Sequence, residues 1–292
     1  MSLPAKSLAS IYAPDRSGLS FELFPPKTAE GDVALLEHVQ QLMAFKPDFF
    51  TCTYGAGGST REKTLSIIRA VKQKFGTPVA SHLTCVGSTV DQLRDYLREA
   101  ERAQIDYIVA LRGDPPRGEE NFRPVPGGLR YANELVGLIR NEFPGLGIAV
   151  AGYPETHREA PSPQADLENL KRKVDAGGEV ILTQLFYQNE DFFRFRDDCV
   201  RMGIHVPIVP GILPVTNLAQ IQRIASLCGA KLPASFVAEL SRREDPDWHF
   251  QVGIEFATNQ VRELLAAGVP GLHFYVLNKS QATAAVLQAV RS

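Results

Sequence analysis

The feature that most constrains the fold is a regular alternation of short apolar runs with longer amphipathic segments along the whole 292-residue chain. The short runs are rich in β-branched and aromatic residues, and the segments between them have the periodicity of helices. Strands that alternate with helices pair in parallel, because each helix carries the chain back along the sheet. The predicted strands are residues 19–24, 49–55, 79–84, 107–113, 147–153, 180–186, 207–213 and 272–277.

Eight such strand–helix units are the number that closes into a (β/α)8 TIM barrel. We therefore predict one α/β domain over residues 1–292, with an N-terminal extension at 1–17 and an extra helix near 233–242, after the seventh strand. A doubly wound open sheet is the alternative. It is disfavoured because the G-x-G-x-x-G expected after its first strand is absent.

Composition excludes several classes of function. The net charge of -2, and the lack of basic runs interleaved with aromatic residues, argue against nucleic acid or anionic lipid as a partner. There is no signal peptide pattern and no run of about 18 apolar residues, so we expect a cytoplasmic protein without a membrane segment that acts on small molecules. Four scattered cysteines without a CxxC pair are typical of reduced core thiols.

Polar residues gather where the predicted strands end, which is where TIM-barrel enzymes place their catalytic groups. On the first strand, alternation puts Ser20, Glu22 and Phe24 on one face. Later strand ends supply Thr53, His82, Arg112, Asp114, Tyr153 and Gln184. Any one of these is usually a hydrogen-bonded surface residue, whereas the set indicates one site built from several loops.

Motifs narrow the chemistry of that site. The six histidines form no HxH or HxxxH pair, so no bound metal is predicted. No predicted strand contains a lysine for a Schiff base, and the G-x-S-x-G of serine hydrolases is missing. Acid–base or redox chemistry remains.

Two further segments have features of ligand sites. The glycine cluster Gly55–Thr60 follows the second strand, where it forms either a tight turn or a close approach to a ligand. In a helix expected at 164–174, a polar stripe lies beside the apolar face and would ordinarily be solvated. The stripe consists of Asp166, Asn169 and Lys173. Helix-start signals are the capping boxes Ser59–Glu62 and Thr89–Gln92, and Ser162 before Pro163.

Taken together, the motifs at these positions resemble the methylenetetrahydrofolate reductase family, in its bacterial type with a catalytic barrel only. In chain order they are SFELFPPK, TYGAGG, HLTC, ALRGDPP, YPETH, QADLENLKRKVDAG, TQLFY, PGILPV and HFYVLNKS, spanning about residues 18–281. The resemblance implies a homo-oligomeric flavoprotein that transfers a hydride from NADH or NADPH through bound FAD to 5,10-methylenetetrahydrofolate. The product would be 5-methyltetrahydrofolate, which serves one-carbon metabolism and methionine biosynthesis.

The same resemblance assigns ligand contacts residue by residue. Flavin contacts fall on Tyr54, Ala56, His82, Arg112, Gly113, Asp114, Ala132, Tyr153, His157, Ala160, Asp166, Asn169, Arg172 and Lys173. Substrate contacts fall on Thr53, Asp114, Gln184, Gln220 and Lys279, with Thr53 and Gln184 also on the nicotinamide side. Nicotinamide and folate must reach the same flavin atom, so their sites overlap and ping-pong kinetics are expected.

Glu22 and Asp114 are the catalytic residues that the resemblance implies. The methylene bridge of the folate opens more easily when its departing nitrogen is protonated, so Glu22 is expected to be the general acid. Phe21, Phe24 and Pro25–Pro26 should raise the pKa of Glu22 by desolvation. Asp114 would lower the potential of the adjacent flavin and bind the pterin.

Three positions depart from the family pattern. Ile224 stands where many relatives have a stacking Phe, Lys279 where some have Arg, and Gly178 where many have Ala. The chain is also expected to lack the C-terminal regulatory domain of eukaryotic relatives. Two alternatives stay open: an amine oxidoreductase similar to proline dehydrogenase, and a non-catalytic barrel that carries folate or flavin.

Overall fold

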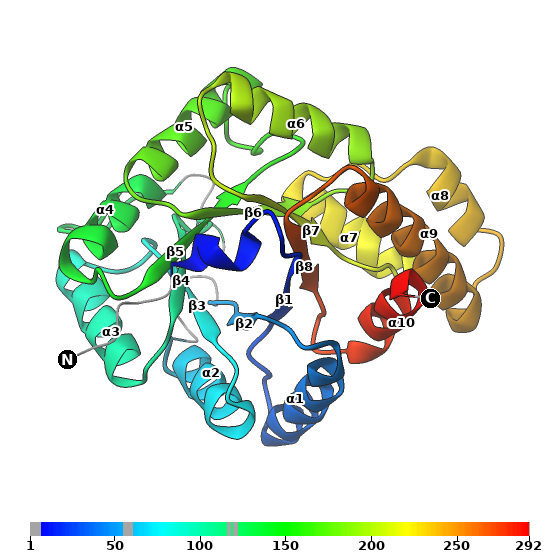
Figure 1. The fold of residues 1–292 in the computed structure, drawn as a ribbon, viewed down its shortest axis with the longest axis horizontal. Coiled ribbons are helices and arrows are strands. Elements are labelled where there is room, and N and C mark those ends of the chain that lie inside the picture. Colours follow the sequence, from blue (N-terminus) through cyan, green and yellow to red (C-terminus); the bar gives the residue numbers. More distant parts are fainter. Residues whose placement is uncertain (1–6, 55–60, 116–117, 119–121, 292) are drawn as a thin grey trace.

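Eight parallel strands close into a barrel in chain order, with helices around it (Figure 1). The computed structural model describes residues 7–54, 61–115, 118 and 122–291. The strands are β1 (Gly18–Leu23), β2 (Phe49–Cys52), β3 (Val79–Thr84), β4 (Tyr107–Leu111), β5 (Gly147–Gly152), β6 (Val180–Leu185), β7 (Ile208–Ile212) and β8 (Gly271–Tyr275). Because β1 pairs in parallel with both β2 and β8, the predicted TIM barrel is confirmed.

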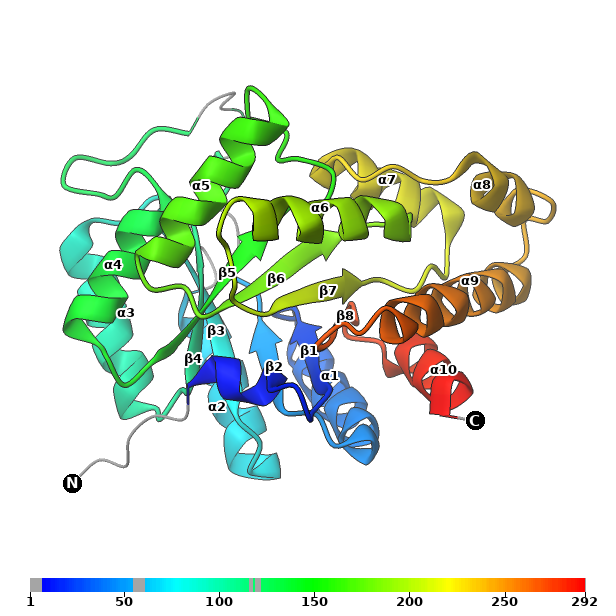
Figure 2. The same cartoon turned by 45° about the horizontal axis from the view of Figure 1, so that its top comes forward.

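The helices follow the predicted alternation. They are α1 (Ala29–Leu42), α2 (Arg61–Phe75), α3 (Val90–Arg102), α4 (Ala132–Glu142), α5 (Pro163–Asp175), α6 (Asn189–Arg201), α7 (Leu218–Cys228), α8 (Ala234–Leu240), α9 (Pro246–Ala266) and α10 (Ser280–Arg291), with short 3-10 turns η1 (Leu8–Tyr12) and η2 (Met43–Phe45). The extra helix expected after the seventh strand is α8. Figure 2 shows α7, α8 and α9 together at one side of the barrel.

Most predicted strands extend too far at their C-terminal ends. Thr53, Arg112 and Tyr153 were placed in strands, but each lies in the loop that follows. Their local pattern is strand-like, and the Thr53 amide still donates to the Leu23 carbonyl at 2.9 Å, but the paired strands end before them. The residues proposed for the site therefore lie on loops that leave the barrel, as expected for a TIM-barrel rim.

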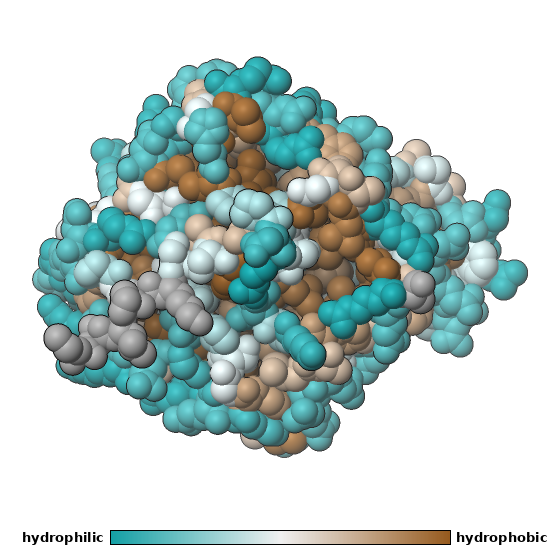
Figure 3. Space-filling view, in the orientation of Figure 1, coloured by the Kyte–Doolittle hydropathy of each residue, from teal (hydrophilic) through white to brown (hydrophobic). Residues whose placement is uncertain are grey.

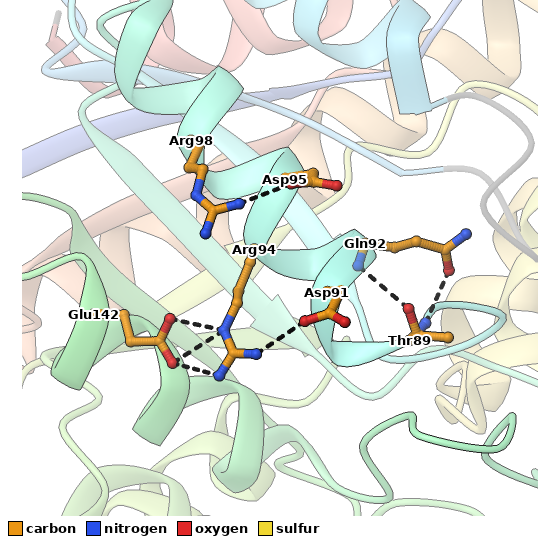
Figure 4. Close-up of polar contacts among 7 residues, drawn as sticks. All are labelled: Thr89, Asp91, Gln92, Arg94, Asp95, Arg98 and Glu142. Carbon is orange, nitrogen blue, oxygen red and sulfur yellow. Dashed lines mark hydrogen bonds and ion pairs between the residues drawn. The ribbon is translucent and has the colours of Figure 1, made fainter.

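The starts of α3 and α5 agree with the capping signals in the sequence. In the capping box of α3, the Gln92 amide donates to Thr89 Oγ1 at 3.3 Å and the Thr89 amide donates to Gln92 Oε1 at 2.9 Å (Figure 4). Ser162 caps α5 by accepting from the Ala165 amide at 3.2 Å, with Pro163 as the first helical residue. The box at 59–62 begins outside the described residues.

The N-terminal end of the barrel is closed by η1. Leu8, Ile11 and Tyr12 pack in one buried cluster with Phe49 and Tyr107 from the barrel interior. In Figure 1 this dark blue turn crosses the barrel, and Figure 3 shows apolar side chains near the centre of the same face within a mostly hydrophilic periphery. Since this end is plugged by side chains, the opposite end of the strands is the one left for a ligand.

Candidate functional site

A buried carboxylate lies between two imidazoles inside the barrel. Glu22 Oε2 on β1 is 3.3 Å from His82 Nε2 on β3 and 3.6 Å from His273 Nε2 on β8. All three residues are buried, with exposed fractions of 6%, 8% and 0%. Strand alternation explains the arrangement, because each residue occupies an inward position near the C-terminal half of its strand. We call these three residues the carboxylate–imidazole group.

Further hydrogen bonds fix the orientation of His273. Its Nδ1 lies 2.8 Å from the hydroxyl of Ser20, the residue beside it in the β1–β8 ladder. Its ring meets the Tyr275 ring edge-on at 5.3 Å, and the Tyr275 hydroxyl donates to the Thr183 carbonyl at 2.7 Å. Sequence reasoning did not select His273 as a site residue. Strand alternation could have identified it, because His273 and Tyr275 are two residues apart and therefore share one face of a predicted strand, as Ser20 and Glu22 do.

The prediction that apolar neighbours raise the pKa of Glu22 is wrong. Burial acts in that direction, but the charges of His82 and His273, at 3.3 Å and 3.6 Å from Glu22 Oε2, outweigh it and lower the pKa of Glu22 to about 2. Phe21 faces the other way and packs against Phe50 with ring centroids 5.5 Å apart, while Phe24 is 36% exposed. Neither phenyl ring encloses the carboxylate, so Glu22 is ionised at neutral pH in this arrangement.

Two groups influenced by the Glu22 charge are held in their neutral forms. Burial, with a smaller contribution from the Glu22 charge, raises the pKa of both the Cys52 thiol and the Tyr275 phenol. Cys52, Cys85 and Cys199 are buried free thiols, and Cys228 is a partly buried one, which confirms the reduced cysteines predicted from the sequence. Glu22 is thus the negative centre of its neighbourhood, and the imidazoles are the groups that can exchange a proton with it.

The loop after β4 presents Arg112 in a fixed position. Its guanidinium donates to both carboxylate oxygens of Glu159 at 2.7 Å and stacks over Phe122 at 5.1 Å. The next residue, Gly113, has φ +88°, and a Cβ there would lie 2.6 Å from a methyl carbon of Val86. Only glycine fits this turn without strain. Asp114 follows it and is exposed.

The β5–α5 connection brings four of the assigned flavin residues together. Asp166 accepts a hydrogen bond from the His157 amide at 2.8 Å, and the rings of His157 and Tyr153 meet edge-on at 4.6 Å. Lys173 reaches back to the Ala151 carbonyl at 2.6 Å, with its ammonium 5.9 Å from the centre of the Tyr153 ring. We call Tyr153, His157, Asp166 and Lys173 the α5 cluster. Two of the three residues of the polar stripe expected to be solvated, Asp166 and Lys173, therefore turn toward the barrel.

Burial perturbs the ionisable groups of the α5 cluster. It lowers the pKa of Lys173 to about 8, against a smaller opposing effect of Asp166. It also lowers the pKa of His157, with the charge of Arg112 as the second cause, and raises the pKa of Tyr153. A cation held where its charged form is disfavoured can be stabilised by a bound anion.

The remaining assigned flavin residues are dispersed. Tyr54 is buried after β2 and its ring meets Tyr96 edge-on at 5.8 Å. Asn169 and Arg172 lie on the solvent side of α5, hydrogen-bonded to each other at 2.5 Å. Ala132 and Ala160 are partly buried at the start of α4 and in the β5–α5 loop. Ala56 falls outside the described residues.

The assigned substrate residues come from separate loops and helices. Thr53 follows β2, and the side chain of Gln184 on β6 accepts from the Leu185 amide at 2.8 Å. Gln220 is exposed in the first turn of α7, and Lys279 is exposed between β8 and α10. Ile224 packs with the apolar cluster under α7 and α8. These side chains come from the loops and helices at the same end of the barrel, so a single ligand would have to bridge them.

The described part of the chain lacks two further kinds of feature. No group of His, Cys, Asp or Glu residues there is arranged to hold a metal ion. No helix among these residues has the length and apolarity needed to cross a membrane.

A closed barrel with polar and ionisable side chains at the C-terminal ends of its strands defines the class: a TIM-barrel protein with an enzyme-type site. The family model for methylenetetrahydrofolate reductase matches residues 8–291, and the chain belongs to this family.

Relatives of both bacterial and plant origin are similar over most of this chain. The 5,10-methylenetetrahydrofolate reductase of Escherichia coli is 42% identical over 283 residues, covering 96% of this chain and 92% of the relative. Methylenetetrahydrofolate reductase (NADH) 1 of Arabidopsis thaliana is 38% identical over 291 residues, covering 96% of this chain and 49% of the relative. The chain thus spans about half the length of the plant relative and nearly all of the bacterial one.

Solved structures share the fold. A Clostridium thermocellum protein described as binding two copies of 5-methyl-5,6,7,8-tetrahydrofolic acid aligns with a TM-score of 0.64 at 16% identity, covering 97% of this chain and 98% of that one. An oxaloacetate acetylhydrolase aligns with a TM-score of 0.53 at 13% identity, covering 98% of this chain and 82% of that one. At such low sequence identity, these alignments show a common barrel fold and nothing about ligands.

Proposed function

We propose that this chain is a flavin-dependent 5,10-methylenetetrahydrofolate reductase that uses NADH or NADPH and produces 5-methyltetrahydrofolate. Family membership and the bacterial relatives support reduction of the folate. Within the structure, the observation that carries the proposal is the carboxylate–imidazole group, a proton-exchanging centre buried at the ligand end of the barrel. The proposed enzyme works by a ping-pong mechanism and assembles as a homo-oligomer.

FAD fits the residues of the α5 cluster and the β4 loop. Lys173 and Arg112 offer cations suited to a diphosphate, and the lowered pKa of Lys173 indicates that a nearby negative charge would stabilise it. The tight turn at Gly113 allows close approach of a ligand to the backbone. When bound, FAD would supply hydride acceptance from the nicotinamide and hydride donation to the folate.

Glu22 is proposed to deliver the proton that opens the methylene bridge. Because its carboxylate is ionised without ligand, the proton has to be held elsewhere first. His82 Nε2 and His273 Nε2 lie within 3.6 Å and can hold it. As the folate excludes water from the site, the charged pair loses solvation and transfer of the proton onto Glu22 Oε2 becomes easier. Glu22 then acts as the general acid toward the departing nitrogen.

The other assigned residues are proposed to orient the folate. The amide of Gln184 and the carboxylate of Asp114 suit the hydrogen-bonding edge of a pterin. The exposed ammonium of Lys279 suits a carboxylate of the folate's glutamate, as a single charge and not as a bidentate fork. Ile224 offers an aliphatic surface where a Phe would stack, so contact with the aminobenzoyl ring would be weaker.

One spectroscopic experiment tests the proposal. Purified protein should take up FAD and turn yellow, NADH or NADPH should bleach the flavin absorbance without oxygen, and methylenetetrahydrofolate should restore it. Comparing the bleaching rates with the two nicotinamides identifies the preferred co-substrate. Bleaching without restoration by the folate would favour an amine oxidoreductase, and failure to take up FAD would contradict a flavoprotein of either kind.

A further inference from the structure

Two consecutive residues after β8 have an unusual backbone conformation. Among the described non-glycine residues with positive φ, Leu277 (+47°) and Asn278 (+55°) are the adjacent pair. L-amino acids disfavour this left-handed region, and a pair of such residues persists only where the surroundings hold it. The strained pair directly precedes Lys279, the cation assigned to the proposed folate site.

The Asn278 side chain joins the ends of two strands. Its Nδ2 donates to the Phe24 carbonyl at 2.7 Å, and its Oδ1 accepts from the Phe24 amide at 2.8 Å. The ladder between β1 and β8 ends just before this point, with the Val276 amide donating to the Glu22 carbonyl at 3.4 Å. The carboxamide thus takes the place of one more peptide group of β8, where the main chain has already turned toward α10.

The residue on the other side of Lys279 is also fixed. Ser280 is fully buried, its hydroxyl lies 3.0 Å from His38 Nδ1 on α1, and it also hydrogen-bonds Gln41. The Lys279 amide donates to the Val276 carbonyl at 2.8 Å. Lys279 is therefore an exposed side chain on a backbone that is anchored on both sides.

We propose that Asn278 is a positioning residue for folate binding. Its two hydrogen bonds fix the loop that carries Lys279 against the loop that follows Glu22, which sets the place of the cation relative to the general acid. This inference rests on the proposed function, because it concerns the same folate site. If the two Asn278 hydrogen bonds served stability alone, their effect on folate binding would not depend on Lys279. That dependence can be measured.

The variant Asn278→Gly removes both hydrogen bonds and retains a residue that accepts the left-handed conformation. Asn278→Asp keeps the acceptor for the Phe24 amide but places a carboxylate oxygen against the Phe24 carbonyl. We expect both variants to weaken binding of 5-methyltetrahydrofolate, measured calorimetrically on the FAD-loaded protein, by about fivefold or more, as for loss of ordinary hydrogen bonds. The rate of flavin bleaching by NAD(P)H should stay unchanged.

A double-mutant cycle tests whether Asn278 acts through Lys279. Lys279→Ala should weaken folate binding by itself, and adding Asn278→Gly to it should cause little further loss. A matched control is Asp48→Ala at the opposite end of β1, where Asp48 accepts from the Leu19 amide at 2.9 Å. This control should lower the melting temperature and leave the folate dissociation constant unchanged.

The outcomes separate this inference from the proposed function. If the unmutated protein does not bind 5-methyltetrahydrofolate, both are wrong. If it binds and Asn278→Gly binds equally well, only the role of Asn278 is overturned. Full additivity with Lys279→Ala, or an equal loss of folate affinity in Asp48→Ala, would also overturn it, because the effect would then be one of general stability.

Discussion

The carboxylate–imidazole group and the α5 cluster differ in how the protein compensates a buried charge. In the carboxylate–imidazole group, Glu22 is balanced by His82 and His273, and its pKa falls to about 2 although burial acts against ionisation. In the α5 cluster, Lys173 donates a hydrogen bond to the Ala151 carbonyl. Its pKa falls to about 8 because burial outweighs the opposing effect of the Asp166 charge. The two imidazoles outweigh burial at the carboxylate, whereas burial outweighs Asp166 at the ammonium.

This difference indicates what each side is built to do. A charge that is compensated internally can exchange a proton with its neighbours without a ligand present. An under-compensated cation destabilises the free protein and is stabilised when an anion binds. The first arrangement suits acid–base chemistry and the second suits retention of an anionic cofactor. Changing the carboxylate–imidazole group should therefore alter the folate half-reaction alone, whereas changing the α5 cluster should alter retention of the cofactor.

The largest effect is expected from Glu22→Gln, which removes the acid and keeps its shape. Folate-dependent restoration of the flavin absorbance should slow by about a hundredfold or more, the usual size of a general-acid contribution. Bleaching by NAD(P)H should continue at the normal rate, because that step does not need this proton. Stopped-flow absorbance measures both rates separately.

A control for this variant is Glu179→Gln at the N-terminal end of the barrel, where Glu179 accepts from the Leu8 amide at 2.8 Å. It should leave both rates unchanged. Equal slowing of both half-reactions by Glu22→Gln, or of neither, would defeat the assignment of Glu22 as general acid.

Lys173→Met tests the opposite side and should act on cofactor retention. Loss of the ammonium should weaken FAD binding about tenfold, as for removal of a charged hydrogen-bonding partner. The FAD-free protein should melt at a higher temperature than the unmutated one, because a buried, under-compensated cation has been replaced by an apolar side chain. Fluorescence titration with FAD and thermal melts provide the two measurements.

Lys171→Met is the matched control on the same helix, because Lys171 lies toward solvent and pairs with Asp175. It should change neither FAD affinity nor melting temperature appreciably. A Lys173→Met protein that binds FAD normally would show that the α5 cluster is not a cofactor site.

The sequence predicted the barrel because strand and helix periodicities are local and recur eight times. The C-terminal ends of the strands were predicted less accurately, as at Thr53 and Arg112, since the end of a strand depends on its pairing with neighbours distant in sequence. The start of α3 was predicted at Thr89 because a capping box is complete within four residues. Arg94, which links Asp91 to Glu142 on α4 in Figure 4, depends on a neighbour that no local pattern identifies.

For the site, sequence reasoning identified Glu22 and His82 but not the electrostatics that join them. The pKa of Glu22 was expected to rise because Phe21 and Phe24 are close to it in sequence. In the structure Phe21 faces the opposite side of the strand, and Phe24 lies beyond the end of β1 and is exposed. The groups that determine its charge, His82 and His273, are 60 and 251 residues away in sequence and adjacent in space. Long-range pairing is the information that a local pattern lacks.

Asp114→Asn should have a smaller effect that crosses the two sides. Asp114 is exposed beyond Gly113 and is assigned to both flavin and folate. Removing its charge should make reduction of the flavin easier and raise its midpoint potential by about 30 mV, a tenfold change for a two-electron couple. Folate binding should weaken as well. A redox titration that gives an unchanged potential would contradict the electrostatic role and leave the pterin contact to be judged from the binding data.

The last prediction concerns acid stability and reports directly on the Glu22 ion pairs. Because the pKa of Glu22 is lowered from 4.5 to about 2 in the folded protein, its ionised form stabilises the fold at higher pH, and that contribution is lost as the pH falls below 4.5 and through about 2. The difference in unfolding free energy between the unmutated protein and Glu22→Gln should therefore narrow as the pH decreases from about 5 to about 3. Urea titrations at several pH values measure it. A difference that widens toward acid would mean that Glu22 is protonated in the folded protein. Desolvation would then be the main influence on the pKa of Glu22.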